Sequence, residues 1–364
     1  MKNAKFFIKC ILAILPILAV MIYASLFPYG YMDIEYPSWK YTKDTAKNIS
    51  ASYNSSISAN SDGPTALFVA GKNEDGSTFT SSDSKSNDYK KALSSTMTVI
   101  LGDSRAMADL VPSEFDTPAV NLAVGGATSI EMYYTLKEFI KNNGKPDNVI
   151  VMFAPFHYSI IDNFWTRTVY FNYLSVQDMM DLYSYAEATG SETLLQKGYK
   201  NDLLSYRMRF PDKYLPALLN AKGFGRYSEN KAKYSKVSAM FGHDQFGTLD
   251  GCSDLNYETS YESMHTTGDA VLLDVYINRL LSLCEKEGIN TTVSIPPMNK
   301  SSYNELNASY TEDLYYYFEA LKSKYKNIKI ESNIPVYDDM YFGDSSHLNR
   351  EGALIFTEEF LSTY

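Results

Sequence analysis

The chain of 364 residues has few of the side chains that bind metals or form disulfide bonds, since it contains only three cysteines and four histidines. The cysteine spacing matches no zinc-binding pattern. Cys10 falls within an apolar run, which leaves Cys252 and Cys284 as the two that could pair in an oxidising compartment. Because Cys284 lies on the apolar side of an expected helix, we expect no disulfide. The sequence predicts no metal centre and no cofactor.

Basic side chains are also in deficit, because 33 Lys and Arg stand against 43 Asp and Glu and give a net charge of −10. Binding to a phosphate backbone requires an excess of positive charge, so nucleic acid is not an expected partner. Hydrophobic side chains make up 45% of the chain, which includes 31 Tyr and 19 Phe. This composition indicates a folded globular body.

Only one long apolar run stands out. It covers residues 10–27, contains no charged side chain, and has about the length that a membrane-spanning helix needs. Lysines occur in residues 1–9, before this run, and flanking lysines favour the cytoplasmic side. We therefore interpret 1–9 as a cytoplasmic flank and 10–27 as a single-pass anchor in the cell membrane, with everything after it extracytoplasmic. A cleaved signal peptide is the competing interpretation.

The remaining sequence divides into a strap and linker over residues 28–95 and a domain over residues 96–364. The strap is aromatic, and the linker is rich in Ser, Asn, Asp and Gly. In the domain, short apolar runs alternate with amphipathic helical patterns. Strands are expected at 98–101, 120–124, 149–153, 291–295 and 328–330, and helices over 129–143, 270–287, 311–325 and 349–361. The alternation predicts an α/β fold with a mainly parallel five-stranded sheet and helices on both faces.

The stretch 159–266 interrupts this alternation and is dense in Tyr, Phe, Met and Arg. We interpret it as a helical insertion. Its aromatic side chains have two possible roles, which are to pack the core of the insertion or to line a groove for sugar rings. His243 and His265 lie in this stretch and are not expected to be catalytic.

Two short motifs at opposite ends of the domain carry the chemistry. Ser104 follows a buried strand directly, in the sequence MTVILGDSR, and so lies at the sheet edge where α/β proteins bind ligands. Near the C-terminus, Asp344 precedes His347 by three residues, a spacing that lets a carboxylate hold one imidazole nitrogen while the other faces a serine. Ser104, His347 and Asp344 form a candidate catalytic triad. The alternative is that these residues only form turns.

These motifs make the sequence similar to the SGNH (GDSL-type) hydrolase superfamily, which has a Gly-Asp-Ser block after its first strand and Asp-x-x-His near its end. Its second block corresponds to residues 121–126, where Gly126 matches the glycine that joins the oxyanion hole. Its third block, Gly-x-Asn-Asp, is replaced by the sequence APFH over residues 154–157. The resemblance implies a three-layer α/β/α fold and an oxyanion hole that includes Ser104 and Gly126. We infer that His157 supplies the donor in place of the missing Asn.

Membrane-anchored members of this superfamily imply a function. The resemblance favours O-acetylation of a cell-surface polysaccharide through an acyl-Ser104 intermediate, with a membrane-bound O-acyltransferase as acyl donor. DltD-like transfer of D-alanine to teichoic acid is an alternative within the same branch. Two others remain open, namely an acylesterase that removes acyl groups from surface glycans and a non-catalytic carbohydrate-binding accessory subunit.

Overall fold

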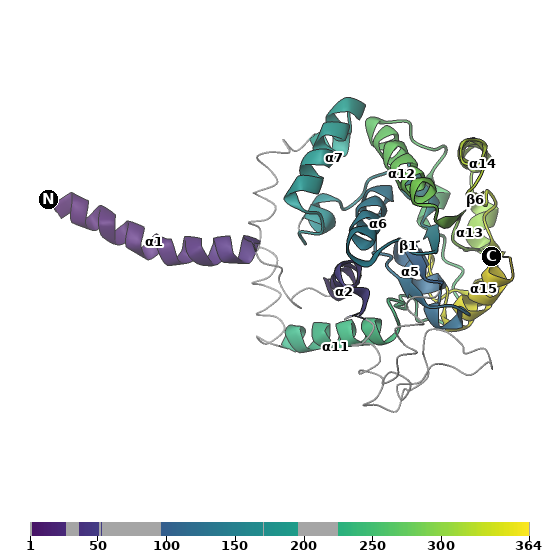
Figure 1. Cartoon of the computed structure of the whole chain (residues 1–364), viewed down its shortest axis with the longest axis horizontal. Helices are drawn as coiled ribbons and strands as arrows, with labels where there is room; N and C mark the ends of the chain where they lie inside the picture. The colour runs from purple at the N-terminus through teal and green to yellow at the C-terminus, as the bar shows by residue number, and fades with distance from the viewer. Residues whose placement is uncertain are drawn as a thin grey trace.

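The computed structural model describes residues 2–26, 36–50, 52, 96–169, 171–195 and 225–363 of the chain. Its centre is a sheet of five parallel strands in the order β2-β1-β3-β4-β6 (Figure 1). The strands are β1 (Thr98–Gly102), β2 (Ala119–Asn121), β3 (Asn148–Met152), β4 (Asn290–Ser294) and β6 (Lys329–Ile330). The prediction of an α/β fold with a mainly parallel five-stranded sheet is confirmed.

The strand order reverses at β1, because β2 lies on one side of it and β3 on the other. All five strands run in the same direction, so their carboxyl ends share one edge of the sheet. Open α/β sheets bind ligands at this edge, at the point where the strand order reverses. The residues that follow β1 and β3 are therefore in the position expected for a functional site.

Five helices pack on the sheet, and each follows a strand or the second sheet in the sequence. They are α5 (Ser104–Asp109), α6 (Ser129–Asn143), α12 (Gly268–Glu287), α14 (Ala308–Lys324) and α15 (Arg350–Thr363). The helix predicted after Gly126 begins with the expected capping box, in which Thr128 and Glu131 satisfy each other's backbone groups. The second sheet pairs β5 (Met298–Asn299) with β7 (Val336–Tyr337).

Helices cover both faces of the sheet, which explains why the central strands β1 and β3 are buried along almost their whole length. Val99 and Val151 point to one face and pack with α6, α12 and α14. Ile100 and Ile150 point to the other face and pack with α5 and α15. Alternate strand residues thus enter two separate hydrophobic clusters, as the pleat of a strand requires.

The predicted insertion is helical over much of its described length. It carries η4 (Trp165–Val169, a π-helix), α7 (Val176–Thr189), α8 (Glu192–Leu195), α11 (Gly225–Ala239) and η5 (Tyr257–Ser260). The remaining short helices are η2 (Pro112–Glu114), η3 (Pro155–Tyr158), α13 (Lys300–Glu305) and η6 (Asp339–Tyr341). Residues 196–224 of the insertion lie outside the described residues.

The predicted strap after the apolar run is partly a helix of the globular body. This helix, α2 (Tyr36–Lys47), buries Trp39, whose ring meets those of Phe171 and Tyr173 edge to face at 5.8 and 5.1 Å between centroids. Trp39 therefore packs in the core. Residues 28–35 and nearly all of the predicted linker lie outside the described residues.

The predicted membrane anchor falls on α1 (Lys2–Leu26), which extends away from the body and has exposed apolar side chains such as Ile11 and Leu15 (Figure 1). Within the described residues, no helix combines the length and the apolarity that crossing a membrane requires. The anchor stays a prediction.

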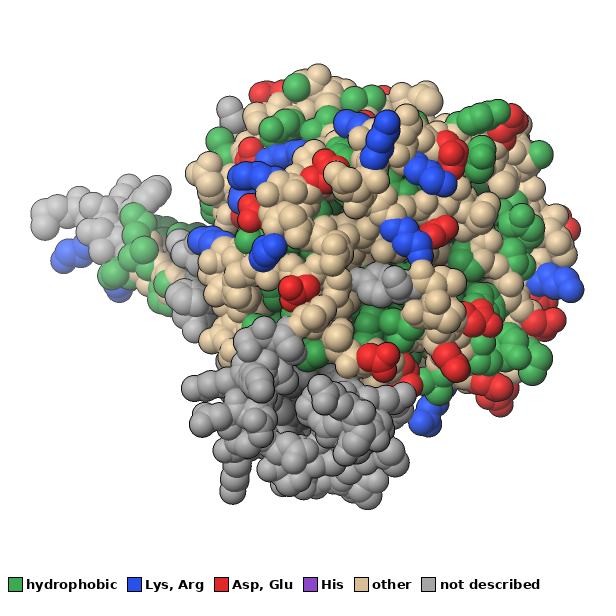
Figure 2. Space-filling view, turned by 45° about the vertical axis from the view of Figure 1, so that its right-hand side comes forward, with side chains coloured by type: hydrophobic (Ala, Val, Ile, Leu, Met, Phe, Trp, Pro, Cys, Tyr) green, Lys and Arg blue, Asp and Glu red, His purple; other side chains and the backbone are tan. Residues whose placement is uncertain are grey.

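On the face of the body that Figure 2 shows, acidic, basic and hydrophobic side chains of the described residues are interspersed.

Gly102 is the last residue of β1, and the backbone of β3 lies against it there. A Cβ at this position would lie 1.8 Å from the Met152 carbonyl oxygen and 2.5 Å from the Ala106 Cβ. We expect Gly102→Ala to lower the free energy of unfolding by about 3 kcal/mol, because the backbone of β3 must move to admit the methyl group. Urea denaturation followed by fluorescence measures this loss.

Gly125→Ala is the matched control, because a Cβ there meets no described atom within 4 Å. Its unfolding midpoint should stay close to that of the wild type. An equal, small effect of the two substitutions would contradict the close approach of β1 and β3 at Gly102.

Candidate active site

Ser104 is positioned by the buried strand before it and the short helix after it. β1 ends at Gly102, and the Asp103 side chain accepts a hydrogen bond from the Arg105 amide at 3.0 Å, which caps α5. Ser104 is the first residue of α5 and is half-buried. The serine is therefore held at the carboxyl edge of the sheet, as its sequence predicts.

The structure brings the three predicted triad residues together. The Ser104 Oγ lies 2.8 Å from the His347 Nε2, although the two residues are 243 positions apart. The His347 Nδ1 lies 2.9 Å from both carboxylate oxygens of Asp344. In this arrangement Nδ1–H donates to the carboxylate, and Nε2 accepts the serine proton, which is the geometry that activates a hydroxyl.

The Asp344 carboxylate is held as an anion. Its Oδ1 accepts hydrogen bonds from the Ser346 and His347 amides, each at 2.8 Å. Burial alone would raise its pKa, but the hydrogen bond and charge of His347 and these two amides outweigh burial and lower the pKa below its ordinary value. The charge of Asp344 is thus available to fix the tautomer and orientation of the imidazole.

The loop that carries His347 is hydrogen-bonded to the helix that carries Ser104. The Leu348 amide donates to the Asp109 carboxyl at 3.0 Å, and the Thr357 hydroxyl of α15 donates to the Asp109 carbonyl at 3.2 Å. Asp109 is fully buried, and burial raises the pKa of its carboxyl well above the ordinary value. The Asp109 side chain and backbone at the end of α5 therefore hold the two ends of the domain together.

A segment of the insertion lies against the other side of the histidine loop. Backbone approaches backbone there, since a Cβ on Gly247 would lie 2.3 Å from the Gly343 carbonyl carbon, and the Leu249 amide donates to the Gly343 oxygen at 3.1 Å. This contact places the Phe246 ring on the His347 imidazole, stacked at 5.0 Å between centroids. Phe246 keeps 37% of its surface exposed beside the triad, and the Lys233 Nζ lies 5.8 Å from its ring centroid.

The prediction that His157 donates to the oxyanion is not met in the structure. Its Nδ1 lies 3.0 Å from the Asp103 carboxylate and its Nε2 lies 3.0 Å from the Asp162 carboxylate, so both ring nitrogens already have acceptors. The imidazole is buried and links the serine turn to the loop after β3. His157 lies near the site, as the sequence predicts, but Asp103 and Asp162 accept from both of its ring nitrogens in place of an oxyanion.

The hydrogen bonds of His157 keep it charged. Burial alone would lower its pKa, but the hydrogen bonds and charges of Asp103 and Asp162 outweigh burial and raise the pKa to about 9. Burial alone would raise the pKa of Asp103, which the hydrogen bond and charge of His157 instead hold below its ordinary value. The three groups form a carboxylate–imidazolium–carboxylate bridge in which Asp103 and His157 are buried and Asp162 is partly exposed.

Gly126, the other predicted oxyanion residue, follows the strand next to β1. The chain after β2 continues beside β1, because the Val124 amide donates to the Gly102 carbonyl at 2.9 Å. Gly126 has a positive φ of 75°, a conformation that favours glycine. The glycine thus lies at the same edge as Ser104, on a turn that a larger residue would strain.

A buried ion pair next to α5 was not predicted from the sequence. The Arg105 guanidinium pairs with Glu258 of η5 at 2.6 Å, and both side chains are almost fully buried. This pair fixes η5 so that Tyr257 is exposed and its ring packs edge to face with Phe156, at 5.5 Å between centroids. The two residues are far apart in the sequence, and no local pattern indicates that they meet.

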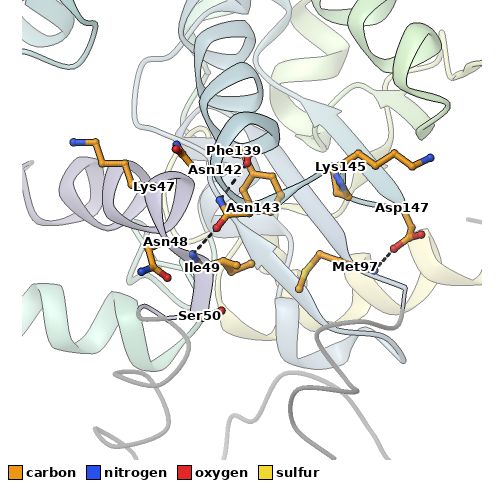
Figure 3. A pocket seen from close by; sticks show the side chains of 11 residues that line it. Lys47, Asn48, Ile49, Ser50, Met97, Phe139, Asn142, Asn143, Lys145 and Asp147 are labelled. Atoms are coloured by element: carbon orange, nitrogen blue, oxygen red, sulfur yellow. Dashed lines mark hydrogen bonds between the residues drawn. The ribbon is translucent and has the colours of Figure 1, made fainter.

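A cavity of about 600 Å³ lies at the opposite end of the sheet and is not part of this site. Met97 and Asp147, which precede β1 and β3, help to line it, with Lys47 and Lys145 on either side (Figure 3). No cluster of three or more His, Cys, Asp or Glu side chains among the described residues could hold a metal ion.

Comparison with known proteins gave no match to a family model, a curated protein or a solved structure.

The charged His157 predicts how stability depends on pH. The folded pKa of about 9 lies above the ordinary value of 6.5, so the folded state keeps a proton that the unfolded state loses between these values. The contribution to stability is complete below about pH 6.5 and is lost as the pH rises through about 9, by on the order of 3 kcal/mol. Chemical denaturation at pH 6, 8 and 10 measures it.

His157→Gln should flatten this dependence, whereas His265→Gln, at an exposed histidine, should leave it as in the wild type. If the wild type and His157→Gln lose stability equally from pH 6 to pH 10, the buried imidazolium is not the cause.

Proposed function

We propose that this protein is a serine acyltransferase of the SGNH type that forms an acyl-Ser104 intermediate and passes the acyl group to a hydroxyl of a cell-surface polysaccharide. The observation that carries the proposal is the continuous hydrogen-bonded line from the Ser104 Oγ through His347 to Asp344. Such a line is the arrangement by which enzymes on unrelated folds activate a hydroxyl for acyl transfer.

The residues divide the reaction into two steps. The Ser104 Oγ attacks the carbonyl carbon of the donor ester while His347 Nε2 takes the serine proton, and the leaving alcohol then receives that proton. In the second step His347 takes a proton from the acceptor hydroxyl, whose oxygen attacks the acyl carbon. The bond from that carbon to the Ser104 Oγ then breaks, and Oγ receives the proton from His347. Asp344 stabilises the imidazolium in both steps.

The choice of a carbohydrate acceptor is supported by the aromatic side chains around the triad. The acceptor oxygen must come close to the His347 Nε2, and the half-exposed Phe246 ring lies on that imidazole. Flat apolar rings suit the C–H faces of sugars. A surface polymer, a membrane-bound acyl donor and an extracytoplasmic location complete the proposal, and these parts follow from the resemblance of the sequence blocks.

Substitution of the triad tests the proposal. With the full-length protein and p-nitrophenyl acetate, Ser104→Ala and His347→Ala should abolish turnover, and Asp344→Asn should lower kcat by about 10⁴-fold because the imidazole loses its orienting charge. Ser345→Ala is the control, since the Ser345 hydroxyl is in the same loop and, among the described residues, forms a side-chain hydrogen bond with the Ser346 hydroxyl alone. Full activity in Ser104→Ala would end the proposal.

The acceptor is tested separately by adding acetylatable oligosaccharides and identifying the products by mass. Serine-dependent appearance of acetylated sugar supports transfer. Release of acetate to water alone, at every sugar concentration, would replace the transferase by an esterase with the same triad.

A further inference from the structure

A cation lies next to the glycine pair at the site, and the two reaction steps above make no use of it. Arg167 belongs to η4, and its Nη1 donates a hydrogen bond to the Gly125 carbonyl oxygen at 3.1 Å. A Cβ built on Gly126 would lie only 2.5 Å from the same Nη1. The missing side chain at Gly126 is what lets the guanidinium reach this position.

The glycine pair and the proposed nucleophile follow neighbouring strand ends. The Val124 amide bonds to the Gly102 carbonyl, so the turn that holds the glycine pair begins beside the turn that holds Asp103 and Ser104. The guanidinium therefore borders the part of the edge where the resemblance assigns the oxyanion hole, which needs donors or positive charge.

Arg167 also borders the loop after β3 on the other side of Ser104. Burial raises the pKa of Asp162, but His157 and the charge of Arg167 outweigh burial and lower it. Asp162 in turn bonds the His157 imidazole at 3.0 Å. The guanidinium thus lies between the loops after β2 and β3, which in the resembling family supply the glycine amide and the Asn side chain.

The helix η4 that carries Arg167 is anchored to the same carboxylate as the Gly126 turn. Thr168 donates to the Glu131 Oε1 at 2.6 Å, and the Thr128 amide and hydroxyl donate to the Glu131 Oε2 at 2.9 and 2.8 Å. On the far side, the buried Trp165 donates to the Thr193 carbonyl at 2.9 Å. Arg167 is therefore held in a fixed relation to Gly126.

We propose that Arg167 is the catalytic residue that stabilises the oxyanion, in the place of the Asn side chain that the third sequence block lacks. The inference rests on the proposed acyl transfer. As the Ser104 Oγ bonds to the carbonyl carbon and its proton moves to His347 Nε2, the π electron pair moves onto the carbonyl oxygen. The guanidinium charge compensates this oxygen together with backbone amides, and the electron pair returns when the leaving group departs.

Arginine suits this role because it stays charged at every working pH. Removing one oxyanion-stabilising group typically costs about 10²–10³ in kcat and leaves ground-state binding nearly intact. We therefore expect Arg167→Gln to lower kcat for p-nitrophenyl acetate by about 100-fold, with KM within about threefold of the wild type. Arg167→Lys keeps the charge and should retain more of the rate than Arg167→Gln.

Chemical rescue separates this role from a structural one. Added guanidinium chloride, at millimolar concentrations that do not unfold the wild type, should restore part of kcat in Arg167→Ala and leave Ser104→Ala inactive. Thr166→Ala, an exposed neighbour on η4, is the matched control and should keep the wild-type kcat. The full-length protein is used throughout, and circular dichroism checks the fold of each variant.

The outcomes distinguish this inference from the proposed function. Loss of kcat in Arg167→Gln with rescue in Arg167→Ala supports it. A wild-type kcat in Arg167→Gln, or a folded Arg167→Ala that guanidinium does not rescue, overturns the role of Arg167 while Ser104-dependent activity still supports acyl transfer. Wild-type protein without Ser104-dependent turnover overturns both.

Discussion

The buried Asp103 carboxylate is the group on which the geometry of the site depends. It accepts hydrogen bonds from the Arg105 and Ala154 amides and from the His157 imidazole, at 3.0, 2.9 and 3.0 Å. One carboxylate thus caps α5, holds the loop after β3 and pairs with a buried cation. Because a carboxylate in a dry interior must be hydrogen-bonded, Asp103 holds these three groups in place next to Ser104.

A second set of contacts joins the start of the domain to its end. Ser104 and His347 are 243 positions apart, and Asp109 joins them by bonding to the Leu348 amide. The Gly247–Gly343 backbone contact adds the insertion to the same loop. The triad is therefore assembled from the start and the end of the domain, and the insertion contacts the loop that carries two of its residues.

The sheet and the triad could be predicted because their signals are local. Apolar runs such as Thr98–Gly102 and Asn148–Met152 mark buried strands, and Asp344 lies within one turn of His347. The partners of His157 could not be predicted in this way. Asp103 comes from a distant turn, and Asp162 is one of many acidic residues, so only the fold shows that both reach the imidazole.

Other residues near the site also could not be predicted, because their contacts join parts of the chain that are distant in the sequence. Phe246 and Glu258 have no motif, and they act through contacts made by the tertiary structure. Arg167 lies on a π-helix whose register follows from the anchoring of Thr168 to Glu131, and periodicity does not show this anchoring. The aromatic residues of the strap suit packing on the domain as well as the lipid interface, and the structure shows that Trp39 packs in the core.

The central claim is that Ser104 is a nucleophile activated by His347. The most direct measurement is to incubate the full-length protein with a fluorophosphonate, digest it and locate the adduct by mass spectrometry, beside His347→Ala and Ser345→Ala treated identically. The account predicts stoichiometric phosphonylation of Ser104 in the wild type and in Ser345→Ala, and strongly slowed labelling in His347→Ala. Labelling spread over several serines, or no labelling of Ser104 at any reagent concentration, would contradict it.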